Sequence, residues 1–330
     1  MATYYDIFGQ KVQYLSSDPA NLTEGQVWYN STSNTAKFQG ILEAWASGAD
    51  MGTSRYGGAE AGTGATSGLA AGGSNPGALR SLTNSEEYNG TSWTEGNNMN
   101  TGRGRISGTG TQTAAVGAGG YSNPGPYSNA TEEYNGSNWT SVTNLPGGIQ
   151  YMGCCGPQTA ALFIGGNTSG TPYVTDTFEY NGSTYSAGGS YPIGVRFVAA
   201  IGEESSALGA GGYVPPGTST DLVNTYNGTA WTAGTNLPGA RKLAGSSGSS
   251  SNDGLIFGGS DNSSLLATNV SWDGTSWSSK PSLSTARQDG QSTTQGSSST
   301  ALYSGGNSPP TVATTEEYTS GPATRTITTS

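Results

Sequence analysis

Short apolar segments, each closed by turn-forming residues, follow one another along most of the chain. In the stretch 159–166, TAALFIGG, an apolar run ends in two glycines. In the stretch 131–141, TEEYNGSNWTS, two short segments with aromatic residues flank an Asn-Gly pair. Short runs bounded by glycine and asparagine are typical of β-strands joined by tight turns. We therefore expect an all-β protein built from many short strands.

The same order of segments returns at a fixed interval. The aromatic residue before the turn recurs every 46 residues, at Tyr88, Tyr134, Tyr180, Tyr226, Trp272 and Tyr318. A pair of glycines precedes each of them, and a second aromatic residue follows the first five, from Trp93 to Trp277. A constant period of this length is the mark of a repeat architecture. The sequence therefore contains six repeats.

Each repeat contains four segments that we interpret as strands. A segment led by arginine comes first, the segment that ends in the glycine pair comes second, and the third and fourth flank the turn. The glycine pairs allow neighbouring backbone to approach closely, and the large aromatic side chains are expected to fill the space between adjacent sheets. Asn and Gly both tolerate the positive φ of a two-residue type I′ turn. This turn is expected at Asn89-Gly90, Asn135-Gly136, Asn181-Gly182 and Asn227-Gly228.

Four strands in each of six repeats predict a β-propeller. The glycine pair, a Tyr about fourteen residues later and a Trp about five or six residues after that resemble the Kelch repeat family, over about residues 41 to 321. The family includes binding modules and copper-radical oxidases. The expected fold is therefore all-β, a six-bladed Kelch-like β-propeller with an N-terminal β-hairpin appendage.

The two ends of the chain are expected to complete the propeller together. Trp45 has the same spacing to a following Met and Arg as Trp93 has, although no earlier strand of a repeat precedes it. Conversely, no aromatic residue follows Tyr318 at the usual position. We expect the Trp45 strand to lie beside the Tyr318 strand in the sixth blade, because pairing hides exposed sheet edges. The alternative is closure by residues 324–329.

Residues 1–40 are expected to form an attachment segment outside the propeller, which occupies residues 41–330. The stretch 24–40, EGQVWYNSTSNTAKFQG, predicts a hairpin with its turn around Asn30 to Asn34. Gly25 through Ser33 resemble short segments near the ends of bacteriophage tail and fibre proteins. The resemblance implies a docking segment onto a virion, and the alternative is an N-terminal cap on the propeller.

The composition excludes several classes of function. Only 10% of the 330 residues are charged, the formal net charge is −10, and histidine is absent. An acidic chain without basic runs is a poor partner for a nucleic-acid backbone. The absence of histidine removes the commonest metal ligand and general base. The histidine-ligated copper site of Kelch-type oxidases is therefore excluded, and no metal or other cofactor is expected.

The two cysteines, Cys154 and Cys155, are adjacent in the sequence. Neighbouring cysteines rarely bond to each other, so we interpret both as small buried hydrophobic residues. A vicinal disulfide and a metal site are the alternatives. The pair does not indicate the redox compartment of the protein.

The sequence contains no evident secretion signal or membrane span. The start, MATYYDIFGQK, lacks a basic region followed by an apolar one. No apolar run approaches ~20 residues. The abundance of Thr, Ser, Asn and Gly nevertheless suits an extracellular surface. A protein assembled in the cytoplasm and released by host lysis reconciles these features, so we expect a virion protein that does not insert into membranes.

The recurring acids argue against catalysis. They occur as the pairs Glu86-Glu87, Glu132-Glu133 and Glu316-Glu317. Glycoside hydrolysis requires a carboxylate pair across a cleft, and a catalytic site should break the symmetry of the repeats. We therefore expect a protein that is not an enzyme.

Arginines open most of the first strands of the repeats. They are Arg55, Arg103, Arg196, Arg241 and Arg287. Together they would ring the mouth of a central channel and hold an anion. The alternative is that each pairs with a third-strand acid such as Glu87 or Glu133, or caps neighbouring carbonyls, because an unpaired buried charge is costly.

The segments after the glycine pairs vary between repeats, whereas the Asn-Gly turns are nearly invariant. The variable loops cover about residues 74–84, 121–131, 167–177, 213–223, 260–269 and 307–315 and are expected on one face. Function tends to lie on variable loops held by a rigid scaffold. The candidate binding residues are Tyr121, Tyr127, Tyr173 and Tyr213, whose rings suit sugars or protein. The alternative is that these tyrosines pack on neighbouring blades.

The sequence thus predicts a non-enzymatic structural or adhesive protein of a phage particle, in the tail, a fibre or the capsid decoration. Its expected partners are other virion proteins and a host-surface glycan or protein, and its oligomeric state is left open. The alternative is a carbohydrate-binding or carbohydrate-processing propeller on a bacterial surface.

Overall fold

The computed structural model describes residues 12–75, 81–122 and 125–327, and this part of the chain forms strands, turns and irregular segments without a helix. The prediction of an all-β protein is confirmed. Residues 76–80 and 123–124, which belong to two of the predicted variable loops, lie outside the described residues. The two ends of the chain, residues 1–11 and 328–330, also lie outside the described residues, and with them part of the predicted attachment segment.

The chain divides into two compact units. The larger unit is Trp45–Tyr318, and the smaller one combines the residues up to Ala44 with those from Thr319 onward. Within the described ranges, no helix is long and apolar enough to cross a membrane.

Five antiparallel sheets of four strands each lie in the described part of the larger unit. Sheet 1 consists of β4 (Ala59–Gly64), β5 (Ser67–Ala71), β6 (Ser85–Tyr88) and β7 (Trp93–Glu95). Sheet 2 consists of β8 (Ser107–Thr111), β9 (Ala114–Ala118), β10 (Thr131–Tyr134) and β11 (Trp139–Ser141). Sheet 3 consists of β12 (Gly153–Cys155), β13 (Ala161–Ile164), β14 (Thr177–Tyr180) and β15 (Tyr185–Ala187).

The remaining two of these sheets follow the same order. Sheet 4 consists of β16 (Ala199–Glu203), β17 (Ser206–Ala210), β20 (Val223–Tyr226) and β21 (Trp231–Ala233). A loop of sheet 4 carries a small ribbon of β18 (Tyr213–Val214) and β19 (Thr218–Ser219). Sheet 5 consists of β22 (Gly245–Ser250), β23 (Asp253–Phe257), β24 (Asn269–Trp272) and β25 (Trp277–Lys280).

Sheet 6 draws its strands from both ends of the chain. Its order is β26-β27-β28-β3, and it continues through β2 to β1. The strands are β26 (Gln291–Ser292), β27 (Thr300–Ser304), β28 (Thr315–Ile327), β3 (Thr35–Ser47), β2 (Val27–Asn30) and β1 (Gln13–Leu15). Strands β3 and β28 contribute residues to both units. Within the larger unit, the rings of Trp45 and Tyr318 lie 5.3 Å apart, so the strand that carries Trp45 is the neighbour of the one that carries Tyr318.

The smaller unit contains the hairpin expected near the N-terminus. Strands β2 and β3 are antiparallel, with Asn30 opposite Thr35. The Asp18 carboxylate accepts hydrogen bonds from Trp28 Nε1 at 2.9 Å and Asn30 Nδ2 at 2.7 Å, and it pairs with Lys37 Nζ at 2.7 Å. The bond from Lys37, followed by those from Asn30 and Trp28, lowers the pKa of Asp18 to about 2. Trp28 and Asn30 therefore stabilise the fold of this unit.

The Asn-Gly turns differ from the prediction. Tyr88 pairs with Trp93, so four residues connect β6 to β7. Gly90 has a φ of +89°, whereas Asn89 is not among the described non-glycine residues with positive φ. Asn89 Oδ1 instead accepts hydrogen bonds from the N–H groups two and three residues later, each 2.9 Å long. The predicted type I′ turn was wrong, because the Asn side chain closes a longer loop. The same bonds recur at Asn135, Asn181, Asn227 and Asp273.

Aromatic side chains pack between adjacent sheets. Tyr134 and Trp139 of sheet 2 belong to the same buried cluster as Ala59 and Leu69 of sheet 1. Their rings lie 5.1 Å apart, which is the distance of a favourable aromatic pair. Large rings thus supply the apolar contact area that a glycine-rich chain otherwise lacks.

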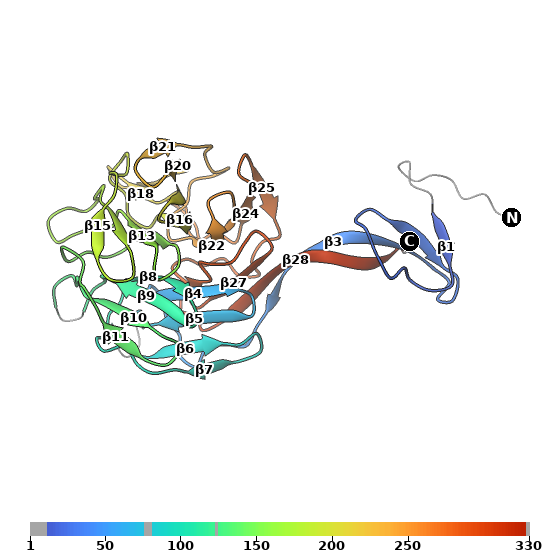
Figure 1. Ribbon diagram of the computed structural model, residues 1–330, viewed down its shortest axis with the longest axis horizontal. Helices are drawn as coiled ribbons and strands as arrows, with labels where there is room; N and C mark the ends of the chain where they lie inside the picture. The colour runs from blue at the N-terminus through green and yellow to red at the C-terminus, as the bar shows by residue number, and fades with distance from the viewer. Residues whose placement is uncertain (1–11, 76–80, 123–124, 328–330) are drawn as a thin grey trace. The chain divides into compact units, whose positions relative to one another are not determined.

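The first strands of the six sheets form a closed series of contacts. Strand β4 contacts β8, β8 contacts β12, β12 contacts β16, β16 contacts β22, β22 contacts β26, and β26 contacts β4. Figure 1 places β4, β8, β16 and β22 on the inner side of the larger unit and β7, β11, β15, β21 and β25 at its periphery. A Cβ on Gly108 would lie 2.6 Å from the Cβ of Ala59, so glycine is needed where β8 passes β4. The arrangement is compatible with a propeller-like fold.

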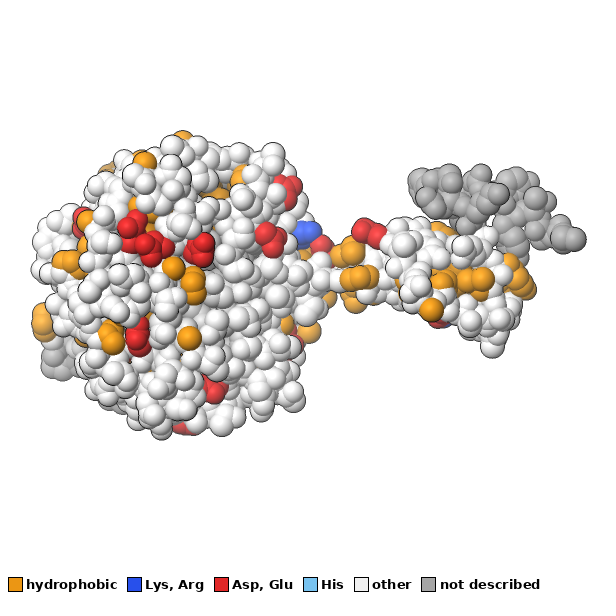
Figure 2. Space-filling view, viewed as in Figure 1, with side chains coloured by type: hydrophobic (Ala, Val, Ile, Leu, Met, Phe, Trp, Pro, Cys, Tyr) orange, Lys and Arg blue, Asp and Glu red, His pale blue; other side chains and the backbone are white. Residues whose placement is uncertain are grey.

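The visible surface of the larger unit is mostly uncharged. Figure 2 shows uncharged polar atoms over most of this face, with scattered Asp and Glu side chains. This distribution follows from a sequence in which only 10% of the residues are charged.

Candidate functional site: an aromatic and cationic cluster

A ring of backbone hydrogen bonds connects the six sheets just before their first strands. Its members have φ between +53° and +62°, and they are Gly57, Arg105, Tyr151, Phe197, Leu243 and Asp289. We call these six residues the hydrogen-bonded ring. At five positions, the N–H donates to the carbonyl of the ring residue in the preceding sheet, as Phe197 N–H does to Tyr151 O at 3.0 Å. The remaining position is that of Arg105, where the N–H of the next residue, Ile106, donates to Gly57 O at 3.2 Å.

The ring holds ordinary side chains in a conformation that favours glycine. A left-handed backbone costs a non-glycine residue of the order of 1 kcal/mol, and such residues persist only where the surrounding structure determines their conformation. Here the inter-sheet hydrogen bonds do so. The consequence is that the side chains of Arg105, Tyr151 and Phe197 are placed at one end of the sheets by rigid backbone.

The variable loops lie at the same end of the sheets as the ring. Gly104, which precedes the ring residue of sheet 2, forms a bridge with Tyr121 of the following loop. Arg196 and Tyr213 form the equivalent bridge in sheet 4. The first loop residue therefore lies beside the start of the first strand in both sheets.

Three cations lie against aromatic rings at this end. The guanidinium carbon of Arg105 is 5.1 Å from the centre of the Tyr151 ring and 5.8 Å from that of Tyr121. Lys242 Nζ is 4.0 Å from the centre of the Tyr213 ring. These distances fall within the range of cation–π attraction.

Arg196 has the most aromatic neighbours of the three cations. Its guanidinium carbon lies 4.9 Å from the ring centre of Phe197, 5.2 Å from that of Tyr173 and 5.4 Å from that of Tyr213. The Phe197 ring also meets the Tyr151 ring edge-to-face at 4.3 Å. We use the name aromatic–cation cluster for Arg105, Tyr121, Tyr127, Tyr151, Tyr173, Arg196, Phe197, Tyr213 and Lys242.

The four tyrosines predicted as binding residues all belong to this cluster. Tyr121 and Tyr127 lie 6.0 Å apart edge-to-face, and Tyr173 and Tyr213 lie 6.1 Å apart. All four are half-buried. They pack on one another, and Tyr121, Tyr173 and Tyr213 also pack on arginine. Tyr127 Oη also accepts a hydrogen bond from Asn167 Nδ2 at 3.3 Å.

The cations of the cluster have no carboxylate within 4.0 Å among the described residues. Burial, followed by repulsion from Arg196, lowers the pKa of Lys242, and Asp261 opposes the shift. Asp289 of the hydrogen-bonded ring has its pKa raised to about 7 by burial, while Arg105 acts against this rise. The site thus concentrates positive charge on a chain whose net charge is −10.

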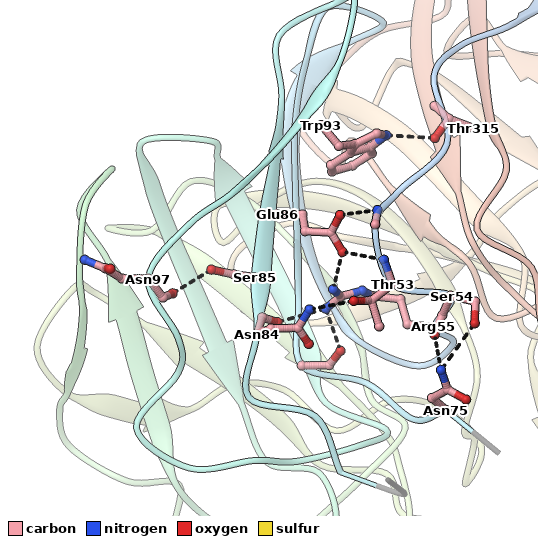
Figure 3. Close-up of polar contacts among 12 residues, drawn as sticks. Thr53, Ser54, Arg55, Asn75, Asn84, Ser85, Glu86, Trp93, Asn97 and Thr315 are labelled. Carbon is pink, nitrogen blue, oxygen red and sulfur yellow. Dashed lines mark hydrogen bonds and ion pairs between the residues drawn. The ribbon is translucent and has the colours of Figure 1, made fainter. Parts of the chain in front are cut away.

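The five predicted arginines do not form one ring. Arg55, Arg103 and Arg287 are at most 1% exposed, and each pairs with a glutamate of its own sheet. Figure 3 shows the pair in sheet 1, where Arg55 Nη2 lies 2.6 Å from Glu86 Oε1. These three arginines therefore follow the alternative interpretation, pairing with a third-strand acid. The partners are one residue before the acids we expected, because successive residues of a strand face opposite sides.

Glu87 and Glu133 face the neighbouring sheet instead. Glu133 accepts a hydrogen bond from Tyr180 Oη at 2.8 Å, and Glu87 accepts one from Tyr134 Oη. Glu179 accepts the equivalent bond from the Tyr226 hydroxyl. The repeated acids are thus engaged in contacts that join strands and sheets.

Arg196 is one residue out of register with the other arginines. The second glycine of each pair donates to the carbonyl at the arginine position of the next sheet, and in sheet 4 this carbonyl belongs to Val195. The equivalent residue of sheet 3 is Ile149. Arg196 therefore lies in the aromatic–cation cluster, whereas Arg241 is buried at the arginine position without a glutamate.

Sequence reasoning did not identify Arg105, Tyr151, Phe197 or Lys242. The signal was present, because the period of 46 residues also connects Arg105, Tyr151 and Phe197. These positions differ in chemistry from repeat to repeat, so the period alone did not mark them as a site, and the backbone conformation they share does.

A small cavity lies behind the hydrogen-bonded ring. It has a volume of about 80 Å³, and Glu60, Arg105 and Tyr151 are among its lining residues. The Glu60 carboxylate accepts hydrogen bonds from the backbone N–H and the hydroxyl of Ser292. Burial raises the pKa of Glu60 to about 8, although the bonds from Ser292 lower it.

The described residues contain no cluster of three or more Cys, Asp or Glu residues that could hold a metal ion. Cys154 and Cys155 are both free and buried in β12. Burial raises the pKa of both thiols above the ordinary range. Both cysteines therefore serve as small packing residues.

Comparison of the chain with models of known protein families found no match, and comparison with curated proteins found none either.

Proposed function

We propose that the larger unit is a six-bladed, Kelch-like β-propeller whose blades are sheets 1 to 6. The closed series of contacts between first strands supports this fold, and so does the hydrogen-bonded ring. In such a propeller the first strand of each blade lies nearest the axis. The strand that carries Trp45 would be the outermost strand of the sixth blade, beside the one that carries Tyr318.

Two truncations test this closure. Deleting residues 1–50 removes the outermost strand of the sixth blade and exposes the edge of β28, whereas deleting residues 1–25 leaves it in place. The longer deletion should lower the melting temperature far more than the shorter one, measured by circular dichroism. Equal melting of the two truncated proteins would contradict closure by Trp45.

We further propose that the aromatic–cation cluster binds a glycan or protein on a host surface. The observation that carries this proposal is a group of three cations among half-exposed aromatic rings, without a carboxylate partner among the described residues. Flat aromatic faces stack on sugar rings, and a few convergent polar groups then fix the orientation of a ligand. The rigid ring backbone would present these groups without an ordering cost.

The protein would serve as a non-enzymatic structural or adhesive component of a phage particle. The engagement of the repeated acids with arginine and tyrosine supports a non-enzymatic role. The resemblance of Gly25 through Ser33 to phage tail and fibre segments supports the virion assignment, with other virion proteins as partners. Mass spectrometry of purified phage particles tests this assignment. The absence of this protein from the particles would favour a bacterial surface lectin.

Single substitutions test the binding proposal. Replacing Arg196 with Gln or Tyr173 with Ala should reduce binding to host cells by about fivefold or more, because each removes a stacked contact of the order of 1 kcal/mol or more. The matched control is Arg325→Gln, which removes an exposed cation of the smaller unit. Melting temperature is measured in parallel. Binding that is unchanged in the cluster variants would contradict the proposal, and a lowered melting temperature in each would assign the residues to packing.

A further inference from the structure

In five of the six sheets, a buried arginine and a facing glutamate are either both present or both absent, and sheet 5 is the exception. The arginine position is occupied in sheets 1 to 6 by Arg55, Arg103, Ile149, Val195, Arg241 and Arg287. The residues at the facing glutamate position are Glu86, Glu132, Phe178, Asn224, Val270 and Glu316. Arginine occurs together with glutamate in three sheets, and both are absent from two. Only sheet 5 retains the arginine without the glutamate.

In sheets 1 and 2, the glutamate has three donors, namely the arginine and two backbone N–H groups. Glu86 accepts from Arg55 and also from the backbone N–H groups of Gly52 at 2.6 Å and Thr53 at 3.1 Å, as Figure 3 shows in part. Glu132 accepts the equivalent bonds from two backbone N–H groups of the preceding connection. The carboxylate is therefore fully engaged when it is present.

Where the glutamate is absent, one of its two backbone donors is absent as well. The residue equivalent to Gly52 is Pro146 in sheet 3, Pro192 in sheet 4 and Pro238 in sheet 5. Proline has no N–H to donate. Sheets 3 and 4 thus lack the arginine, the glutamate and this donor together, whereas sheet 5 lacks the glutamate and the donor but has the arginine.

Arg241 is buried in an incomplete set of contacts. It is 4% exposed, and its three hydrogen bonds, to Ile256 O, Thr268 O and Thr268 Oγ1, are 3.2 to 3.4 Å long. The three hydrogen bonds of Arg103, one of which is its ion pair with Glu132, are 2.6 to 2.9 Å long. A buried cation without a counter-charge is costly. An anion beside the Arg241 guanidinium would therefore be stabilised.

A cavity of about 620 Å³ occupies the space beside Arg241. Val270 and Asp261 are among the residues that line it, and the Asp261 carboxylate forms no ion pair with Arg241 within 4.0 Å. The equivalent space beside Arg287 and Glu316 measures about 100 Å³. The missing glutamate side chain thus coincides with open space next to a cation.

We propose that this Arg241 cavity binds a ligand through its carboxylate group, which takes the place of the absent glutamate. The guanidinium fork suits the two oxygens of a carboxylate. The Thr268 hydroxyl, which also lines the cavity, would bind a neutral polar group of the same molecule. The volume accommodates a ligand of the size of one acidic sugar, so uronic acids are the chemical class that we assign. The proposal is independent of the aromatic–cation cluster.

Thermal unfolding with and without D-glucuronate tests the assignment. The melting temperature of the wild-type protein should rise by about 2 °C or more at a glucuronate concentration well above the dissociation constant. D-glucose, which has similar size and no charge, should leave it unchanged at the same concentration. Calorimetric titration of the wild-type protein should give saturable binding of glucuronate at one site.

Variants at the glutamate position provide the decisive comparison. Val270→Glu places a carboxylate beside Arg241, so it should raise the melting temperature without ligand and abolish the response to glucuronate. Val270→Gln has the same size without the charge and should abolish the response without raising the melting temperature. Arg241→Gln leaves the space and removes the cation, and it should abolish binding if it folds with an unchanged circular dichroism spectrum.

Four outcomes would overturn the proposal. A wild-type protein that does not respond to glucuronate would exclude the site. An equal response in Val270→Glu would place glucuronate elsewhere, and retained binding in Arg241→Gln would remove the cation from recognition. An equal response to sulfate would contradict the assignment to carboxylates.

Discussion

Sheets 2 and 5 occupy equivalent positions in the repeat but treat the same buried arginine differently. In sheet 2, Arg103 has Glu132 at 2.9 Å and short bonds to two carbonyls. In sheet 5, Arg241 has three longer bonds and faces Val270 across an open cavity. Arg103 thus belongs to a complete hydrogen-bond network, whereas the network around Arg241 lacks its carboxylate.

This difference helps to distinguish residues that serve the repeated architecture from residues with a role in one sheet alone. In sheets 3 and 4 the whole network is replaced together, which is expected where an isolated charge would cost free energy. A single retained cation is therefore more informative than the three complete pairs. Equivalent positions in the six sheets can be compared directly, so the unusual position is recognised within one chain.

The largest expected effect comes from converting sheet 2 into the state of sheet 5. Glu132→Val leaves Arg103 and two backbone N–H groups without their acceptor, so the free energy of unfolding should fall by about 3–5 kcal/mol. Arg241→Met should change it by less than about 1.5 kcal/mol, since no carboxylate loses its partner. Urea unfolding followed by tryptophan fluorescence measures both values.

The control for this comparison is Asp176→Ala, which removes an exposed carboxylate. Its stability should lie within about 0.5 kcal/mol of wild type. If Glu132→Val and Arg241→Met destabilise the protein equally, the two arginines contribute alike, and the distinction between a complete and an incomplete network is wrong.

Much of the fold could be predicted from the spacing of a few residues. The 46-residue period, the glycine pairs and the aromatic pairs indicate four strands per repeat because each has a steric reason to recur. The neighbouring positions of Trp45 and Tyr318 follow from counting which strands each terminus lacks. Which of two adjacent glutamates faces the arginine was not predicted correctly, because it depends on the register of the third strand.

Glu60, a half-buried carboxyl group, tests whether an acid without a cation behaves as Arg241 does. Glu60 accepts hydrogen bonds from Ser292, and no cation lies within ion-pair distance of it among the described residues. Its pKa is raised to about 8, so the folded state binds a proton more tightly than the unfolded state does. Stability from this group is therefore complete below about pH 4.5 and is lost as the pH rises to about 8.

Glu60→Gln should remove this loss. At pH 9 the variant should be more stable than wild type by about 1–3 kcal/mol, and at pH 4 the two should be nearly equal. Melting curves across this pH range measure the difference. A constant difference at all pH values would mean that the carboxyl group does not titrate between these limits.

The candidate site was less accessible to sequence reasoning than the fold. The four loop tyrosines were identified because variable loops on a regular scaffold stand out. Arg105, Tyr151 and Phe197 were missed because their shared property is a left-handed backbone held by bonds to the next sheet, which residue type does not encode. The Asn-Gly loops were misjudged for a related reason, since the Asn side chain rather than its φ closes the turn.

A smaller effect is expected at the tryptophans of the fourth strands. Trp93 Nε1 donates to Thr315 Oγ1 at 2.9 Å, as Figure 3 shows, whereas the buried Trp45 Nε1 has no partner. Both tryptophans pack against a tyrosine of the neighbouring strand in the same sheet. Trp93→Phe should therefore cost about 1 kcal/mol more than Trp45→Phe, because only the former breaks a hydrogen bond. Equal losses in urea unfolding would show that packing alone sets the cost.

The smallest expected effect concerns the turn of sheet 5, where Asp273 replaces the Asn of the other turns. Its carboxylate accepts bonds from the N–H groups of Ser276 and Thr275, and these bonds lower its pKa. A lowered pKa gives stability that is present above the unfolded-state value and is lost as the pH falls through the folded-state value. Asp273→Asn should keep the turn and remove this dependence, so the two proteins should have similar melting temperatures at pH 7 and diverge below about pH 4.

Asn89→Asp in sheet 1 is the reciprocal variant, and it should acquire the same loss in acid. If neither substitution changes the acid side of the stability profile, the exposed turn carboxylate contributes nothing measurable, and the distinction of sheet 5 is confined to its buried arginine.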